Sequence, residues 1–203
     1  MNLRPEDYLR QTASETLAIQ ARFHEECGAK IVEAARTLGK SIRSGGKVLI
    51  LGNGGSAADA QHMAAEMVGR MLVDRRPLPA IALTTDSSNL TAIGNDFGFD
   101  FVFVKQVQAL ARPGDVVIAI STSGNSRNVV AAAVEARKLG ATVIALTGGT
   151  GGKLKEACDI LLNVTLGPNS SRIQESHIFA VHGMVDLLDR YFLDAPEGEA
   201  GVY

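Results

Sequence analysis

The sequence predicts a single α/β domain, a parallel five-stranded sheet flanked by helices, with an N-terminal helical extension. Short, apolar, β-branched runs recur along the chain, stretches with helical spacing of apolar residues separate them, and glycine-rich loops follow several of the runs. Runs that are apolar throughout are typical of strands that helices cover on both faces. With 203 residues, of which 46% are hydrophobic, the chain is long enough to bury a full core.

The first part of the chain, residues 1–45, is predicted to form the helical extension. Pro5, followed by two acidic residues, suits a helix start, because proline tolerates the first turn and acids favour the positive end of the helix dipole. Gly28 lies inside the apolar pattern, so the segment forms either a helical hairpin or one kinked helix. The pattern leaves open whether this extension packs on another subunit or on the chain's own core.

Strands and helices then alternate through the main domain, residues 46–193. Residues 194–203 are predicted to form a flexible acidic tail. The expected strands cover 47–51, 80–84, 116–120, 142–146 and 160–164, and the expected helices cover 56–72, parts of 87–111, 126–139, 152–157 and 171–192.

Composition excludes several classes of protein. The 20 basic and 22 acidic residues leave no basic surface for nucleic acid at the level of net charge. No apolar stretch approaches the roughly 20 residues of a membrane span, and the polar N-terminus lacks a signal-peptide core. Cys27 and Cys158 form no disulfide framework. We therefore expect a cytoplasmic protein with neither a nucleic acid nor a membrane as partner.

The loops after the strands carry the candidate binding groups, because ligands of open parallel sheets bind at the carboxyl ends of the strands. Glycine-rich loops occupy 52–56 and 147–152, and the loop 121–126 holds four hydroxyl groups. Hydroxyls beside a helix N-terminus suit a phosphomonoester, and the missing P-loop lysine argues against nucleotide hydrolysis. The alternative is that Ser126 only caps the helix. The four hydroxyl residues are Ser121, Thr122, Ser123 and Ser126.

The first glycine-rich loop also fits a dinucleotide-binding fingerprint, Gly52-x-Gly54-x-x-Ala57. That fingerprint requires an acidic residue about 20 residues further on, whereas Asp86 lies about 30 residues beyond the loop. The chain also leaves little room for a separate substrate domain. A nicotinamide-dependent enzyme is therefore the less favoured reading.

Ionisable side chains follow the same loop. His62 and Glu66 are four residues apart and share one face of the predicted helix, and Arg70 lies four further on. The plain alternatives are an exposed ion pair and a solvated arginine. Asn95 and Asp96 lie in a segment flanked by glycines, and these residue types predict a turn unless something else favours a binding role.

The last predicted helix carries two further histidines. His182 has apolar sequence neighbours, so the alternative is that it is a buried histidine with its hydrogen bonds made inside the core. His177 lies five residues earlier and is not on the same helical face. Gln174 and His182 are eight residues apart, about 12 Å along a helix axis. One small site can hardly take both from one straight helix, so different subunits are expected to contribute.

Five segments together resemble the sugar isomerase (SIS) domain family and, within it, the phosphoheptose isomerases. The segments are GNGGSAADAQHMAAEMVGR (52–70), GNDFGFD (94–100), ISTSGNSRNV (120–129), LTGGTGG (146–152) and RIQESHIFAVH (172–182). The resemblance implies a cytoplasmic homotetramer with active sites between subunits. It implies an aldose–ketose isomerase that converts sedoheptulose 7-phosphate to D-glycero-D-manno-heptose 7-phosphate, the first step of nucleotide-activated heptose biosynthesis.

The resemblance also implies residue roles. Glu66 matches the base that removes the carbon-bound proton and His182 the acid that serves the carbonyl oxygen. One zinc per subunit would be held by His62, Glu66, Gln174 and His182. The expected substrate-binding residues are Asn53, Gly54, Gly55, Ser56, Glu66, Arg70, Asn95, Asp96, Ser121, Thr122, Ser123, Ser126 and Gln174.

A non-catalytic alternative has the same fold. The segments AADAQH (57–62), PAIALTTD (79–86) and GNSRNVV (124–130) are similar to SIS proteins that bind the replication initiator DnaA. That subfamily lacks the residues that match Glu66 and His182. Both are present here, and proton transfer needs them whereas a scaffold does not, so the enzyme is favoured.

Overall fold

The computed structural model describes residues 3–193; the predicted acidic tail, 194–203, lies outside the described residues. Five strands form one sheet in the order β2-β1-β3-β4-β5, and every neighbouring pair is parallel. The predicted fold class is confirmed. The strands are β1 (Val48–Gly52), β2 (Ala80–Ala82), β3 (Val116–Ser121), β4 (Thr142–Gly148) and β5 (Ile160–Val164).

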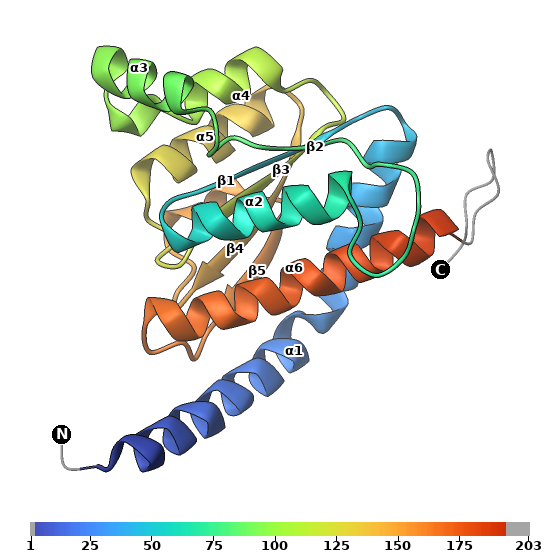
Figure 1. Ribbon diagram of the computed structural model, residues 1–203. Helices are drawn as coiled ribbons and strands as arrows, with labels where there is room; N and C mark the ends of the chain where they lie inside the picture. Colours follow the sequence, from blue (N-terminus) through green and yellow to red (C-terminus); the bar gives the residue numbers. More distant parts are fainter. Residues whose placement is uncertain (1–2, 194–203) are drawn as a thin grey trace.

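Helices cover both faces of this sheet (Figure 1). α1, α2 and α6 pack on one face, and α4, α5 and η2 pack on the other. Because strand side chains alternate, Ile50 and Ile118 face the first group while Leu49 and Val117 face the second. The helices are α1 (Pro5–Arg43), α2 (Gly55–Val68), α3 (Ser87–Phe97), α4 (Val104–Leu110), α5 (Arg127–Lys138) and α6 (Ser170–Leu193), with 3₁₀ turns η1 (Phe99–Phe101) and η2 (Lys153–Ala157).

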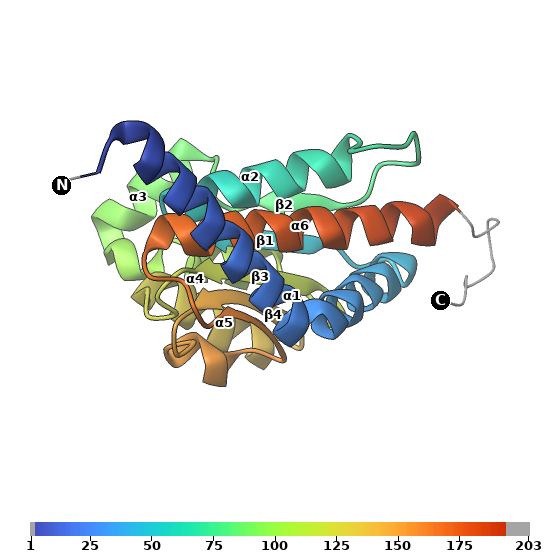
Figure 2. The ribbon, with the colours of Figure 1, turned by 90° about the horizontal axis from the view of Figure 1, so that it is seen from below.

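α1 is one continuous helix of 39 residues that runs through Gly28, so the hairpin alternative is wrong. Figure 2 shows that it changes direction along its length, and Figure 1 shows its N-terminal part extending away from the sheet. The later turns bury Phe23, Ile31 and Leu38 in the core. The earlier turns expose Leu9 and Leu17. The division of the chain at residues 45 and 46 stays a prediction.

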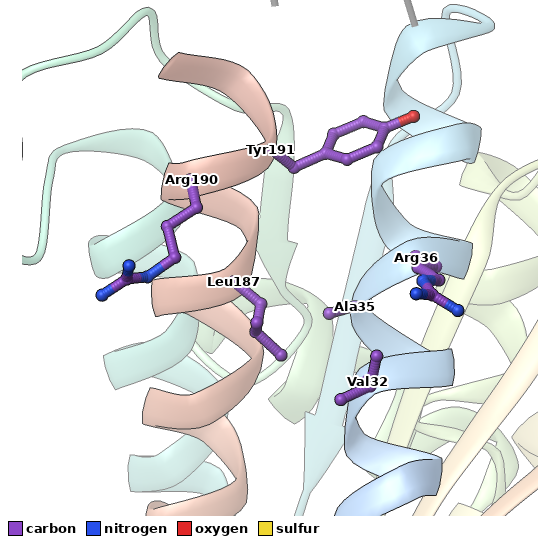
Figure 3. Close-up of a pocket in the computed structure, with 6 residues that line it drawn as sticks. All are labelled: Val32, Ala35, Arg36, Leu187, Arg190 and Tyr191. Carbon is purple, nitrogen blue, oxygen red and sulfur yellow. The ribbon is translucent and has the colours of Figure 1, made fainter. Parts of the chain in front are cut away.

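α1 and α6 leave a small, mainly apolar hollow between them (Figure 3). The Tyr191 ring reaches from α6 towards α1, and it lies so close to Gly39 that a Cβ there would be 2.8 Å from Cε1. Glycine permits this approach without a shift of the Tyr191 ring. The hollow is lined by Val32, Ala35, Arg36, Leu187, Arg190 and Tyr191.

Two elements are shorter than predicted. α2 ends at Val68 because Gly69 closes it, its N–H bonding the Ala65 carbonyl at 2.8 Å, and Arg70 therefore lies outside the helix. β2 is an edge strand that pairs with β1 over three residues. Between residues 3 and 193, no helix has the length and apolar character needed to cross a membrane.

Candidate active site

The strand order places the candidate site at a switch point of the sheet. The connection from β1 leads outward to β2 and the one from β3 leads the other way to β4, so the loops after β1 and β3 open side by side. The two loop regions are joined by a reciprocal amide pair. Asn53 and Asn128 each donate an Nδ2–H to the other's Oδ1 at 2.9 Å. The predicted convergence of these loops is thus present in one chain.

The hydroxyl-rich loop bonds within itself and gives α5 no capping bond from its N-cap residue, whereas Asn128 Oδ1 accepts from the Val129 N–H at 2.9 Å. Ser121 donates to Ser126 Oγ at 3.0 Å, and Ser123 Oγ accepts from the Asn125 N–H at 3.2 Å. Ser126 holds the N-cap position but makes no capping hydrogen bond, so the alternative that it serves only as a cap is wrong. The first N–H groups of α5 point to the carboxyl edge of the sheet.

The loop after β4 braces this hydroxyl loop. Asn125 Oδ1 accepts from the Lys153 N–H at 3.1 Å, and the Gly124 carbonyl accepts from the Leu154 N–H at 2.9 Å. Gly124 has a φ of +64°, and a Cβ there would overlap the Gly151 backbone. Thr122 Oγ1 lies 3.4 Å from Ser170 Oγ at the start of α6. Three strand-end loops and one helix start are therefore locked together.

The ionisable residues meet where α2 and α6 lie side by side (Figures 1 and 2). His62 Nε2 is 3.3 Å from Glu66 Oε1 on its own helix and 3.3 Å from His182 Nε2 on α6. Glu66 Oε2 is buried without a hydrogen-bond partner in the described part of the chain. His182 is exposed, so the alternative of a satisfied core histidine does not hold for it.

These three side chains have the donor types that zinc prefers. Tetrahedral coordination at about 2.0–2.1 Å sets neighbouring ligand atoms about 3.3 Å apart, which both measured distances match. The unpartnered Glu66 oxygen adds a spare acceptor. The three residues fit a zinc ion on this donor chemistry. As placed, however, residues 3–193 hold no group of three or more His, Cys, Asp or Glu arranged as a complete metal site.

Gln174 and His182 lie at different positions along α6 and line different hollows, as their eight-residue spacing predicted. Its side-chain amide packs against Gly55 at the start of α2, and it lines a hollow that includes His62. His182 lines a second hollow with Leu72 and Phe179. Within one chain, His62 lines the first hollow and contacts His182, which lines the second.

Asp59 is a site residue that the sequence reasoning missed. It lines the hollow that holds His62 and Gln174, and its Oδ2 is buried without a partner in the described residues. Burial raises the pKa of the Asp59 carboxyl, and the nearby His62 offsets part of that rise. The signal was available, because Asp59 precedes His62 by three residues and so shares its helical face.

Several predicted substrate-binding residues stand apart from this cluster. Arg70 is exposed just beyond α2. Asn95 and Asp96 lie in α3 rather than in a turn; both are exposed, and the Asn95 amide donates to Asp96 Oδ1 at 2.8 Å. Ser56 is buried near the start of α2, and Gly54 has a φ of +56° at the helix N-cap.

His177 is the buried histidine of α6. Its Nε2–H donates to the Thr147 carbonyl at 3.0 Å, and its Nδ1 has no hydrogen-bond partner within residues 3–193. Burial lowers the pKa of His177 to about 4. This ring fixes α6 to the end of β4 and is not part of the His62–Glu66–His182 cluster, in agreement with the five-residue spacing.

Replacing His177 with Gln is expected to flatten the pH dependence of stability. Because the folded-state pKa lies below that of an unfolded histidine, the unfolded chain binds the proton first, and the parent protein should lose about 3 kcal/mol as the pH falls from about 6.5 to about 4. Gln keeps a donor for Thr147 but does not titrate. Urea unfolding at pH 6.5 and 4.5 measures the free energy of unfolding at each pH. An equal change between the two pH values in parent and variant would contradict the prediction.

Comparison with known proteins identifies the family. The SIS domain family matches residues 12–148. The phosphoheptose isomerase of Campylobacter concisus is 54% identical over 160 residues, which cover 78% of this chain and 84% of the relative. The chain belongs to the phosphoheptose isomerase family of SIS-domain enzymes. The Neisseria meningitidis member is 50% identical over 193 residues, which cover 92% of this chain and 98% of that relative.

Solved structures of the family agree. The phosphoheptose isomerase of Neisseria gonorrhoeae is 46% identical with a TM-score of 0.87, over 92% of this chain and all of that one. The Francisella tularensis structure is 38% identical with a TM-score of 0.89, over 93% of this chain and 100% of that one. The predicted family and the predicted role of a sugar-phosphate isomerase are confirmed. These relatives give no support to the DnaA-binding alternative.

Proposed function

We propose that this chain converts sedoheptulose 7-phosphate to D-glycero-D-manno-heptose 7-phosphate, the first step of nucleotide-activated heptose biosynthesis. The observation that carries the proposal is the joining of His62 to both Glu66 and His182 at 3.3 Å, where α2 and α6 lie side by side. A carboxylate and an imidazole at one point can serve the two sides of a proton transfer.

The phosphate is proposed to bind at the hydroxyl loop. The α5 N-terminus offers a positive dipole end and the N–H groups of Arg127 and Asn128, which Ser126 does not cap, and the serine hydroxyls can turn to donate. No lysine is needed for this, which fits the near-neutral composition. The proposed substrate-binding set remains Asn53, Gly54, Gly55, Ser56, Glu66, Arg70, Asn95, Asp96, Ser121, Thr122, Ser123, Ser126 and Gln174.

The proton transfer is proposed to run through an enediol. Glu66 takes a proton from C1 of the open-chain ketose while His182 gives a proton to the carbonyl oxygen at C2. Glu66 then returns its proton to C2, and the C1 hydroxyl proton goes back to His182, which leaves the aldose and the starting protonation states. The unpartnered Glu66 Oε2 supports its role, since that oxygen is free to accept.

Zinc is the proposed cofactor, one per subunit, held by His62, Glu66, Gln174 and His182. When bound, zinc would polarise the carbonyl oxygen as a Lewis acid. One oxygen of Glu66 and one ring nitrogen of His182 would then hold the ion, and the other oxygen and nitrogen would remain for the proton transfer. His62 Nε2 faces both Glu66 and His182, and as a neutral imidazole it either shares one N–H between them or offers its lone pair to a cation. The donor types of His62, Glu66 and His182 support the assignment.

A homotetramer in the cytoplasm, with active sites between subunits, is also proposed. Exposed Leu72 and Phe179 lie beside His182, and another subunit would cover them. Equilibrium sedimentation measures the assembly directly.

Incubation with sedoheptulose 7-phosphate tests the function. We expect an aldose product, detected by coupling to a heptose 7-phosphate kinase or by NMR of the anomeric carbon. Ketoses without the phosphate should turn over poorly, because remote binding energy is lost. Absence of turnover by the tetramer loaded with zinc would overturn the proposal.

Replacing Ser121 with Ala is expected to raise KM about 10- to 150-fold with little change in kcat, because one hydrogen bond to a charged phosphate is worth about 1.5–3 kcal/mol. Ser41, a buried serine that donates to Gly114 O at the amino edge of the sheet, supplies the control Ser41→Ala. Steady-state kinetics measure both variants. An unchanged KM in Ser121→Ala would place the phosphate elsewhere.

Removal of zinc by chelation is expected to lower activity, and re-addition should restore it. Elemental analysis should find about one zinc per chain in the parent. It should find far less in His62→Gln, because a metal site loses affinity for its ion when a ligand is removed. His24→Gln, a histidine on α1 whose ring stands edge-on to Phe179, is the control and should keep its zinc. Full activity of metal-free protein would remove zinc from the proposal.

A further inference from the structure

A buried ion pair joins the loop after α2 to α6. Arg75 Nε lies 2.8 Å from Asp189 Oδ1, and each side chain is 2% exposed. By comparison, Lys47 in the pair that it forms with Asp115 is 26% exposed. A charge pair this deeply buried rarely adds stability over apolar residues of the same size, so its presence calls for another explanation.

The Arg75 guanidinium also donates to backbone carbonyls at the end of α2 and, through Nη1, to the Arg76 carbonyl at 3.3 Å. Its Nη2 donates to the Glu66 carbonyl at 2.8 Å, and its Nη1 donates to the carbonyls of Met67 at 2.8 Å and Gly69 at 3.0 Å. The Glu66 and Met67 carbonyls belong to the last turn of the helix and the Gly69 carbonyl follows it directly, so no further N–H of the helix can reach them. One of them belongs to the proposed base.

α2 has no basic residue in its own last turn. The positive charge that favours a helix C-terminus is therefore brought from the following loop by Arg75. Arginine suits this place because its planar fork can serve several acceptors at once and stays charged when buried. The end of α2 is thus held by a side chain whose other side is fixed to α6.

Three cross-contacts tie the two parallel helices in order along their length. Gln174 packs on Gly55, His182 meets His62, and Asp189 reaches the Glu66 turn through Arg75. Asp189 follows His182 by seven residues, which places both on nearly the same side of α6, about 10 Å apart along its axis.

We propose that Arg75 and Asp189 are positioning residues, whose buried pair holds the backbone of Glu66 on α2 in fixed relation to His182 on α6. Neither residue touches the cluster of proposed catalytic side chains. They act by preventing the last turn of α2 from shifting away from α6. This inference rests on the proposed roles of Glu66 and His182.

The test uses two variants of the full-length protein. The double variant Arg75→Met/Asp189→Leu removes both charges together, because removing one alone would leave the other buried and unpaired. Arg75→Lys keeps the charge pair but loses the fork that serves the carbonyls. We expect kcat to fall about 10- to 100-fold in the double variant, with KM nearly unchanged, and to fall less in Arg75→Lys.

A readout independent of turnover follows the helix itself. Amide hydrogen exchange of the last turn of α2, near Met67 and Gly69, should speed up in both variants, and the imidazole NMR signals of His62 and His182 should shift. Lys47→Met/Asp115→Leu is the matched control, since that pair lies at the opposite, amino edge of the sheet. It is expected to change stability without changing kcat or these signals.

The outcomes are distinct. Parent-like kcat, exchange and histidine signals in a folded double variant would overturn the positioning role. If the double variant does not fold, Arg75→Lys decides by the same three measurements. If the parent itself fails to isomerise the sugar phosphate, the proposed function fails. The positioning role of Arg75 and Asp189 is then judged on hydrogen exchange and the histidine signals alone.

Discussion

Glu66→Gln is expected to abolish isomerisation while the protein stays folded. The amide has nearly the shape of the carboxylate but cannot take a proton from carbon, and a general base contributes about 10²- to 10⁴-fold to rate. Glu66 Oε2 has no hydrogen-bond partner among the described residues, so no polar contact of that oxygen is lost in the variant. kcat should therefore fall by that factor, with an unchanged melting temperature.

The control for this variant is a glutamate of similar exposure in another helix. Glu26 on α1 is 26% exposed, against 22% for Glu66, and it accepts from Thr165 at 2.7 Å. Glu26→Gln should leave kcat unchanged. Exchange of the C1 proton with solvent deuterium, followed by NMR, checks the assignment further. Turnover or exchange retained by Glu66→Gln at the parental rate would remove Glu66 as the base.

Most of the fold was readable from the sequence because a parallel sheet leaves a strong local signal. Runs such as Val116–Ser121 are apolar on both faces, and the helices between them repeat apolar residues at a regular spacing. The extent of α1 was harder to predict. Gly28 suggested a break, yet the helix continues, because Phe23 and Ile31 on either side are both packed into the core.

The site was predicted where its residues follow strands or share a helical face. The hydroxyl loop and the pair His62–Glu66 are of this kind. The association of His62 with His182 was implied only by the family resemblance, because the two residues are 120 apart in sequence and no local pattern places their helices side by side. Arg75 was missed for the same reason: its role depends on a distant aspartate and on backbone carbonyls.

The second large effect is expected from Gly124→Ala. Gly124 has a φ of +64°, which costs a residue with a Cβ about 1–2 kcal/mol, and that Cβ would also overlap the backbone of Gly151. Backbone atoms cannot move aside as the end of a flexible side chain can. The hydroxyl loop must therefore separate from the loop after β4, which breaks the bond from Lys153 N–H to Asn125 Oδ1.

The separated loops would no longer present the proposed phosphate-binding groups in one place. KM for the sugar phosphate should rise at least about tenfold, since correctly placed donors to phosphate act together.

The control is Gly114→Ala, at a φ of +89° with no atom within 4 Å of the added Cβ. It carries the backbone cost without the collision, so it should lose stability by a smaller amount and keep its KM. Thermal unfolding and steady-state kinetics on both variants separate the two costs. Equal loss of stability with unchanged KM in both would show that the contact between Gly124 and Gly151 does not shape the binding loop.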